Sequence, residues 1–443
     1  MTIKFADSVQ VEELWIKNFK SLRDVHLRLS SLNIVVGPNA SGKTNLINAL
    51  EFIKECLKPI PSYRPWRRWW TARNIVWMRD ETLPLVFGFK TNAYGIKFSY
   101  EFTCSVLGGR LKITDEVLKV EKWATIRREG SSIELIYDEE FKERVRAETG
   151  EKIEDQYIEL EKEPLYTILI KPPFIIAGSF HKNFWKCRLH LPEEKPIEFI
   201  SPKAPVEGVL KTRKSISQPV VTSVRKSLYN FVLDVVRRLI GGLVVIRQLD
   251  LKEIKTPQEH VKTLNLDSNC KNLYVVLYNL FLKENKLPDF IDEHFRLAFP
   301  DYTLLFDLTE DGRVFVKLKD LRTSLELPPP CMPDGLHKFL AILTALELKP
   351  IILAIDELEN SMHPQLIELV IDALKASNTT VIVTTHSPAV VDLVEPEDLV
   401  LAEMTPRGTV FKRIVEPEKV REELRRLGIT LSERWLWGKL LAK

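Results

Sequence analysis

The sequence predicts an α/β protein whose parallel sheet is interrupted in the chain by a long insertion. A continuously apolar, β-branched run at 32–36 is typical of a strand buried on both faces. After residue 330, helical segments alternate with apolar strands, an order typical of parallel sheets. Between these regions, from about residue 82, alternating apolar and polar residues indicate antiparallel strands.

The first predicted elements are two short strands, a buried strand and a helix. Residues 11–18 and 24–29 have the pattern of short strands, and LNIVV at 32–36 is the buried strand. After a loop, apolar residues recur at helical spacing, namely Leu46, Ile47, Leu50 and Ile53. The order is therefore strand, loop, helix.

The middle of the chain has the pattern of a β-meander followed by mixed structure. The segments LPLVFGF, GIKFSYEFTCSV and RLKITDEVLKV predict its strands. The charged stretch 139–163 predicts one or two short helices, which are too short for a long coiled-coil arm. Further apolar runs predict a strand at 166–170 and helices near 220–239 and 273–282.

The last third returns to helices and apolar strands in alternation. We expect a helix from Leu336, a strand at 351–355, a helix from Pro364 and a strand at 381–385. One α/β domain would thus combine residues 1–55 and 270–443. Residues 56–269 would form an inserted β-meander and a mixed α+β, partly helical subdomain.

Composition limits the classes of protein that fit the chain. Its 443 residues are 28% charged and 45% hydrophobic with a net charge of +3, as in a soluble globular protein without a global nucleic-acid-binding charge. It has no basic start followed by an apolar segment and no run of about 20 apolar residues, so we expect a cytoplasmic protein without membrane contact. The five scattered cysteines lack CxxC spacing and predict free thiols rather than a zinc site.

A phosphate-binding loop is predicted between the buried strand and the helix, because the segment fits the pattern G-x-x-x-x-G-K-[ST] and has both flanks. Its residues are Gly37, Pro38, Asn39, Ala40, Ser41, Gly42, Lys43 and Thr44, followed by Asn45. Glycines let backbone N–H groups converge on phosphate oxygens at a helix N-terminus. Lys43 would reach the β- and γ-phosphates of ATP, and Thr44 would bind Mg²⁺.

Polar residues that suit metal binding and hydrolysis follow the last two apolar strands. Asp356 is placed to hold Mg²⁺ or its water shell, and Glu357 to polarise the water that attacks ATP. Strands ending in Asp-Glu are also ordinary helix N-caps, and the phosphate-binding loop favours the catalytic interpretation. His386 follows the next strand and could hydrogen-bond the γ-phosphate at the carboxyl edge of the sheet.

A further anion site is predicted at the N-terminus of the helix from Leu336, which follows Pro333, Asp334 and Gly335. The alternative is an Asp-capped helix of the core. The residues alone do not indicate whose phosphate such a site would bind.

Four segments resemble the ABC-type ATPases of the SMC/RecF/OLD group, especially small predicted AAA-family ATPases without a Toprim domain or a long coiled coil. They are NFKSLRDVHLRLSSLNIVVGPNASGKTNLINAL, PDGLHKFLAILTAL, IILAIDELENSMHP and VIVTTHSP. The resemblance covers 11–53 and about 270–443. It implies a P-loop NTPase fold of the ABC-ATPase head type, with ATP hydrolysis as the reaction.

The resemblance also implies a role for each motif. Residues 37–44 would be the Walker A loop, Asp356 the Walker B carboxylate, Glu357 the catalytic base and His386 the switch histidine. Residues 333–335 would lie in the signature motif, which touches the γ-phosphate of the opposite subunit. Two ATP molecules would then be enclosed between two heads of an ATP-dependent homodimer.

Two departures from the family's pattern leave the function open. Pro333 stands where the signature normally has serine, and it offers neither hydroxyl nor backbone N–H. No glutamine marks the Q-loop soon after the Walker A helix. Slow hydrolysis is therefore one expectation. The candidate functions are an ATPase of DNA maintenance or repair, or of defence against foreign DNA, and a nucleotide-gated interaction protein that signals to a separately encoded effector.

Residues 61–80 interleave arginines with tryptophans, a composition used by single-stranded nucleic-acid sites. They include Arg64, Arg67, Arg68, Arg73 and Arg79, and Trp66, Trp69, Trp70 and Trp77. This segment makes DNA a candidate partner. The alternative is that the tryptophans pack under the β-meander while the arginines pair with the acidic stretch at 139–163. A second basic run, at 211–226, is more typical of a solvated loop.

Overall fold

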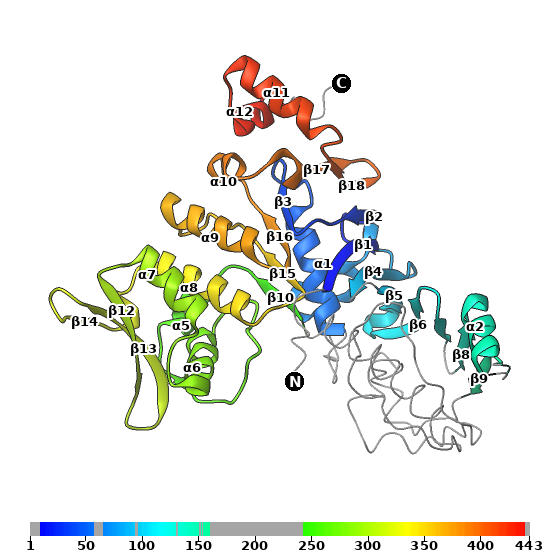
Figure 1. The fold of residues 1–443 in the computed structure, drawn as a ribbon, viewed down its shortest axis with the longest axis horizontal. Coiled ribbons are helices and arrows are strands. Elements are labelled where there is room, and N and C mark those ends of the chain that lie inside the picture. The colour runs from blue at the N-terminus through cyan, green and yellow to red at the C-terminus, as the bar shows by residue number, and fades with distance from the viewer. Residues whose placement is uncertain are drawn as a thin grey trace.

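The computed structural model describes residues 9–56, 65–93, 96–129, 132–149, 152, 154–159 and 242–438. The strand predicted at 166–170, the helix near 220–239, the basic run 211–226 and Arg64 lie outside these residues. Figure 1 shows a central sheet with α1 against it, a second sheet beyond α1, and helices on the opposite face.

The central sheet, sheet B, has the strand order β10-β15-β16-β3-β17-β18. Its neighbours are parallel except for the last pair, β17 and β18. The strands are β10 (Leu243–Ile246), β15 (Ile352–Ile355), β16 (Thr380–Thr384), β3 (Leu32–Val36), β17 (Leu399–Thr405) and β18 (Gly408–Arg413). All five residues of β3 are buried, as its unbroken apolar run predicts. The predicted parallel sheet is therefore present.

Helix α1 (Lys43–Cys56) lies between sheet B and an antiparallel sheet, sheet A. The order of sheet A is β2-β1-β4-β5-β6-β7-β8-β9. Its strands are β1 (Val9–Phe19), β2 (Leu22–Arg28), β4 (Leu85–Ala93), β5 (Ile96–Ser105), β6 (Lys112–Val120), β7 (Ala124–Glu129), β8 (Ser132–Tyr137) and β9 (Gln156–Glu159). Leu46, Leu50 and Phe52 of α1 share one apolar core with Leu14 of β1 and Val35 of β3. The predicted meander thus covers the helix that begins in the phosphate-binding loop.

Helices of the described ranges cover the other face of sheet B. Among them are α6 (Leu273–Glu284), α7 (Asp289–Ala298), α8 (Asp334–Glu347), α9 (Pro364–Ala376) and α10 (Pro388–Asp392). Alternation along β3 explains the two cores, because Ile34 and Val36 face these helices whereas Val35 faces α1. A small antiparallel sheet, sheet C, packs on the same side; it contains β11 (Gln258–Glu259), β12 (Tyr302–Leu308), β13 (Arg313–Asp320) and β14 (Glu326–Leu327).

The remaining helices lie around this framework (Figure 1). They are α2 (Glu139–Thr149), α5 (Leu251–Ile254), α11 (Pro417–Leu427) and α12 (Leu431–Leu436). None of the helices in the described ranges is both long and apolar enough to cross a membrane. Four of the five cysteines are described, and all four are free thiols, as predicted: Cys56, Cys104, Cys270 and Cys331.

Strand β10 differs from the predicted division of the chain. It lies within 56–269, the predicted insertion, yet it pairs in parallel with β15 from Leu243 opposite Ile352 to Ile246 opposite Ile355. Four apolar residues carry too little periodicity to distinguish a strand from other buried segments. The predicted domain boundaries otherwise stay a prediction.

A buried ion pair stabilises sheet A and gives a first testable prediction. Arg128 of β7 is 1% exposed and Glu116 of β6 is fully buried, with Arg128 Nη1 2.8 Å from Glu116 Oε2. Arg128→Met is expected to lower the free energy of unfolding by about 3–5 kcal/mol, because it leaves a buried carboxylate without the guanidinium that faces it. Denaturant unfolding followed by circular dichroism measures the change. The exposed neighbour Arg127 provides the control, since Arg127→Met should change the free energy by less than about 0.5 kcal/mol. Equal effects of the two substitutions would contradict the prediction.

Candidate functional site

Three predicted motifs meet at one edge of sheet B. Strands β15, β16 and β3 are consecutive parallel neighbours, so their carboxyl ends point the same way. Asp356 and Glu357 directly follow β15, and the loop from Gly37 directly follows β3. His386 is separated from the end of β16 by one residue, Thr385. The sheet thus gathers residues that lie about 350 positions apart in the chain.

Lys43 is held in the centre of the loop. Its side chain is 4% exposed, and Nζ donates to the carbonyl oxygens of Gly37 at 2.8 Å and Pro38 at 2.9 Å. Burial lowers the pKa of Lys43, and the nearby carboxylates of Glu357 and Asp356 oppose that shift. Lys43 therefore lies within the electrostatic influence of the acidic residues after β15.

The loop is closely packed at its glycines. A Cβ added at Gly42, where φ is +99°, would lie 2.0 Å from Thr409 Oγ1 of β18, and one at Gly37 would lie 2.3 Å from the carbonyl oxygen of Ala402. Ser41 is buried, and its Oγ has no hydrogen-bond partner among the described residues. A buried hydroxyl without a hydrogen-bond partner lowers the stability of the fold. A hydrogen bond from this hydroxyl to a phosphate oxygen would remove that cost.

The other predicted loop residues are accessible or held from outside the loop. Pro38, Asn39, Ala40 and Thr44 are exposed. Asn45 is half-buried, and its Nδ2 donates to Ser21 Oγ at 2.8 Å. The Thr44 hydroxyl is thus open to a ligand at the first turn of α1.

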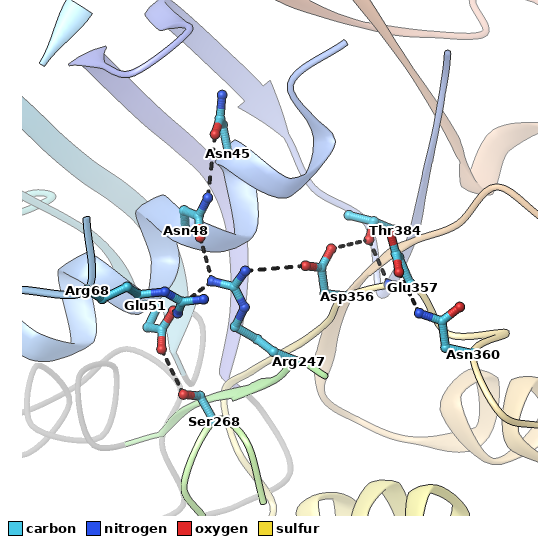
Figure 2. A network of polar contacts seen from close by, with 10 residues as sticks. All are labelled: Asn45, Asn48, Glu51, Arg68, Arg247, Ser268, Asp356, Glu357, Asn360 and Thr384. Atoms are coloured by element: carbon cyan, nitrogen blue, oxygen red, sulfur yellow. Dashed lines mark hydrogen bonds and ion pairs between the residues drawn. The ribbon is translucent and has the colours of Figure 1, made fainter. Parts of the chain in front are cut away.

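Thr384 joins the two acidic residues after β15 (Figure 2). Its Oγ1 donates to Asp356 Oδ1 at 2.7 Å and accepts the backbone N–H of Glu357 at 2.9 Å. Asp356 is 9% exposed, and burial raises its pKa while the Thr384 hydrogen bond and the charge of Arg247 oppose the shift. Sequence reasoning did not single out Thr384, although it ends the strand beside β15.

Glu357 has a left-handed backbone conformation, with φ of 50°. Such a conformation costs a non-glycine residue about 1–3 kcal/mol and persists where surrounding contacts fix it. Besides the bond to Thr384, the Glu357 carbonyl oxygen accepts from Lys338 Nζ at 2.5 Å, and the Glu357 carboxylate accepts from Asn360 Nδ2. Burial lowers the pKa of Lys338 to about 8. The backbone of the predicted catalytic base is therefore fixed on two sides.

His386 is exposed at the same edge. Glu359 orders the backbone there, because its Oε1 accepts the N–H of His386 at 2.7 Å and its Oε2 accepts from Thr385 Oγ1 at 2.8 Å. The loop after β15 and the loop after β16 are thus connected, with the imidazole left accessible.

Asp334 and Gly335 form the first turn of α8, beginning two residues earlier than predicted. Asp334 Oδ1 accepts from Lys255 Nζ at 2.6 Å, and its side chain is about half exposed. A Cβ at Gly335 would lie 2.4 Å from the carbonyl oxygen of Ser361. The start of α8 therefore packs directly on the loop that follows Glu357. Whether a second subunit's nucleotide meets this turn stays a prediction.

His337, in the same turn, makes α8 sensitive to acid. It is fully buried, its Nδ1 lies 2.6 Å from the Tyr274 hydroxyl, and burial lowers its pKa from 6.5 to about 4. Between these values the unfolded chain binds a proton that the folded chain does not, so stability falls as pH falls from 6.5 to 4. The expected loss is about 3 kcal/mol. Urea unfolding across this pH range should show it.

The loss of stability in acid is tested with two variants. These are His337→Phe and, as a control, His260→Gln at an exposed position. His337→Phe should remove this part of the pH dependence, whereas His260→Gln should keep it. A wild-type stability that stays constant from pH 6.5 to 4 would contradict the prediction.

Sequence reasoning missed the residues that follow β10. Arg247 contacts Asn48 and Glu51 of α1 through Nη1, and its Nη2 lies 3.7 Å from Asp356 Oδ2 (Figure 2). Gln248 comes next and is exposed at the same edge of the sheet. The signal available in the sequence was weak, because only the pairing of β10 with β15 brings VIRQ to the site.

The arginine- and tryptophan-rich segment combines the two predicted alternatives. Trp66 is 2% exposed in the core of sheet A and α1, and Trp69 packs partly against that core, whereas Trp70 is 89% exposed. Arg68 pairs with Glu51 of α1 rather than with the acidic stretch after residue 139. Arg67 and Arg79 are exposed. The segment therefore anchors itself on the core and leaves one tryptophan and several arginines accessible.

The residues present fit ATP and Mg²⁺. The loop offers backbone N–H groups, a buried lysine and an unpaired serine hydroxyl, and it packs without room for side chains at Gly37 and Gly42. The oxygen donors that the motifs offer to a metal are the Thr44 hydroxyl, in the first turn of α1, and the Asp356 carboxylate, directly after β15. In the described part of the chain no three His, Cys, Asp or Glu side chains cluster as metal ligands. A set of few oxygen ligands suits Mg²⁺, which keeps waters and substrate phosphates in its shell.

Two family models match the chain. One is described as an AAA ATPase domain and matches residues 10–203; the other is described as "AAA domain, putative AbiEii toxin, Type IV TA system" and matches residues 247–392. The chain therefore carries AAA-type ATPase domains. The matched ranges contain the phosphate-binding loop in the first model, and Asp356, Glu357 and His386 in the second. The ATPase family predicted from the motifs is confirmed, and with it the mixed α/β P-loop NTPase fold.

Solved structures similar to these ATPase domains include SMC heads. An SmcHead bound to the C-winged helix domain of ScpA has 12% identity and a TM-score of 0.49, over 91% of this chain and 97% of that chain. An Smc head with an extended coiled coil from Pyrococcus furiosus has 12% identity and a TM-score of 0.45, over 94% and 100%. An SMC head domain from Thermotoga maritima has 13% identity and a TM-score of 0.37, over 91% and 99%. No curated protein matches the chain in sequence.

Proposed function

We propose that this protein binds ATP with Mg²⁺ and hydrolyses it at the carboxyl edge of sheet B. The observation that carries the proposal is the meeting of Lys43, Asp356 and Glu357 at that edge, where the two carboxylates act electrostatically on the lysine. A cation for phosphate oxygens, a metal-binding carboxylate and a candidate base are the parts that attack of water on a γ-phosphate needs.

Each residue has a separate task in this proposal. Lys43 binds the β- and γ-phosphates, and Thr44 and Asp356 hold Mg²⁺, which when bound neutralises charge on the phosphates. Glu357 takes a proton from the attacking water, and its fixed backbone keeps the carboxylate in place. His386 hydrogen-bonds the γ-phosphate. Gln248, at the end of the strand beside β15, is our candidate for the Q-loop glutamine.

We further propose that two copies of the protein enclose two ATP molecules. The start of α8 supports this arrangement, because a helix N-terminus is an anion site and Gly335 packs directly against the loop after Glu357. Through that contact, a phosphate of the other copy could influence the position of the catalytic base.

For the process that ATP serves, we propose defence against foreign DNA. The description of the second family model as a putative AbiEii toxin of a type IV TA system supports defence more directly than DNA maintenance or repair. The exposed Trp70 beside Arg67 supports a nucleic-acid contact. The other candidate is a nucleotide-gated switch for a separate effector, favoured by Pro333 because proline cannot give the phosphate a hydroxyl or an N–H.

The test measures phosphate release and oligomeric mass with ATP, with Mg²⁺ or a chelator, and with or without single-stranded DNA at two salt concentrations. The proposal expects Mg²⁺-dependent turnover, an ATP-dependent dimer and stimulation by DNA that weakens with salt. Dimerisation with almost no turnover would support the switch. Neither turnover nor nucleotide binding would contradict the proposed function altogether.

A further inference from the structure

The two groups proposed to hold Mg²⁺ lie on different elements. Thr44 is in the first turn of α1, and Asp356 follows β15 of sheet B. A metal site made of two such parts depends on the distance between them, since Mg²⁺ demands near-ideal octahedral geometry. A side chain that contacts both elements could therefore set how well the site binds its metal.

Arg247 is such a side chain, as Figure 2 shows. Its Nη1 donates to Asn48 Oδ1 and, at 3.0 Å, to Glu51 Oε2, and its Nη2 lies 3.7 Å from Asp356 Oδ2. Asn48 and Glu51 follow Thr44 at helical spacing, so all three lie along one side of α1. Because the guanidinium group is planar and rigid, the contacts of Nη1 on α1 fix the position of Nη2 beside Asp356.

Several contacts hold this arginine in place. The Arg247 side chain is 14% exposed and that of Glu51 is 13% exposed. The backbone N–H of Arg247 donates to the carbonyl oxygen of Ser268 at 2.8 Å, while Ser268 Oγ donates to Glu51 Oε1 at 2.7 Å. Arg68 pairs with Glu51 as well. Arg247 and Glu51 thus form a braced connection rather than a mobile surface pair.

One oxygen of the Asp356 carboxylate, Oδ2, accepts no hydrogen bond among the described contacts. Oδ1 accepts the hydrogen bond of Thr384, whereas Oδ2 is 3.7 Å from Arg247, beyond hydrogen-bonding distance. The guanidinium group therefore orients Oδ2 by its charge without using the lone pairs that a cation or its water would need.

We propose that Arg247 is a positioning residue that sets the distance between the Thr44 hydroxyl and the Asp356 carboxylate and so determines the Mg²⁺ concentration that the protein requires. This inference rests on the proposed function. Residues that orient metal ligands typically change metal affinity about 10–100-fold when they are replaced. The same range is expected here.

Arg247→Lys is the direct test, because lysine keeps the charge but its single ammonium group cannot reach Asn48, Glu51 and Asp356 together. The Mg²⁺ concentration for half-maximal ATP turnover should rise about 10-fold, with turnover at saturating Mg²⁺ within about threefold of wild type. Glu51→Gln should shift the same midpoint upward, because it weakens the hold on Nη1. It provides a second variant should Arg247→Lys fold poorly.

A measurement without turnover separates this inference from the proposed function. Mn²⁺ binding in the presence of ADP, followed by electron paramagnetic resonance, should weaken about 10-fold in both variants. The control is Arg421→Lys, since Arg421 on α11 likewise contacts several acceptors, the carboxylates of Glu395, Glu397 and Glu418, but outside the site. It should leave both readouts unchanged.

The outcomes are distinct. An unchanged metal midpoint and unchanged Mn²⁺ affinity in folded Arg247→Lys would overturn the inference and leave the proposed function standing. A fall in turnover at every Mg²⁺ concentration, without a midpoint shift, would also overturn it, because it would indicate a structural role only. If wild type bound Mn²⁺ and ADP without hydrolysing ATP, the proposed function would fail while the Mn²⁺ titration still decided the role of Arg247.

Discussion

Glu357→Gln is expected to lower the rate of ATP turnover about 10²–10⁴-fold, the contribution typical of a positioned base. The amide has nearly the shape of the carboxylate, and its oxygen can still accept the hydrogen bond from Asn360 Nδ2. Thr384 and Lys338 hold the backbone through its N–H and carbonyl groups, so the loop should keep its conformation. The change therefore removes a proton acceptor and little else.

The same variant should accumulate an ATP-bound dimer, since in the proposed arrangement ATP that is not hydrolysed would continue to join the two copies. Phosphate release and light scattering in the presence of ATP and Mg²⁺ measure the two effects. Glu403→Gln is the control, because it removes the same charge from a half-exposed position on β17 that pairs with Lys412. Turnover retained in Glu357→Gln would mean that another group accepts the proton.

Lys43→Met is expected to weaken ATP binding about 100-fold. The substitution removes the cation proposed to bind the phosphates, and hydrogen bonds to charged groups contribute about 1.5–3 kcal/mol each. Because Nζ already donates to the carbonyl oxygens of Gly37 and Pro38, the lysine is held in the loop before ATP arrives. Titration with a fluorescent ATP analogue measures the affinity.

Lys412→Met is the matched control for Lys43→Met, since Lys412 is about half exposed and contacts only a surface carboxylate among the pairs described. It should bind the analogue as wild type does. Thermal unfolding without nucleotide should show that both variants are folded. An unchanged affinity in Lys43→Met would remove the loop at 37–44 from the binding site.

The elements predicted best were those whose apolar residues follow one regular pattern along the whole element. The run LNIVV became β3, buried at every position, and the helical spacing of Leu46, Leu50 and Ile53 became α1. Each pattern reflects one environment along the whole element, either two covered faces or one apolar stripe. The same reason explains the correct placement of α8, α9 and β16.

The parts that sequence reasoning missed depend on contacts between distant segments. Arg247 lies 196 positions from Glu51, its partner on α1, and nothing in VIRQ indicates that contact. Thr384 was predicted only as part of an apolar strand, yet it connects Asp356 to the backbone of Glu357. Such pairings are decided by strand order, which single-segment patterns do not contain.

The place of β3 in sheet B also governs when a growing chain can first use its phosphate-binding loop. Residue 36 is made early, but both neighbours of β3, the strands β16 and β17, begin at residues 380 and 399. At about 5–20 residues per second, translation needs roughly 17–70 seconds to produce the first of them. During that time sheet A can already cover one side of α1, whereas β3 lacks both neighbouring strands and is open to chaperones and proteases. The proposed site, in which Asp356 and Glu357 lie beside the loop after β3, can form only once β16 has been made, so ATP bound there would stabilise a nearly complete chain.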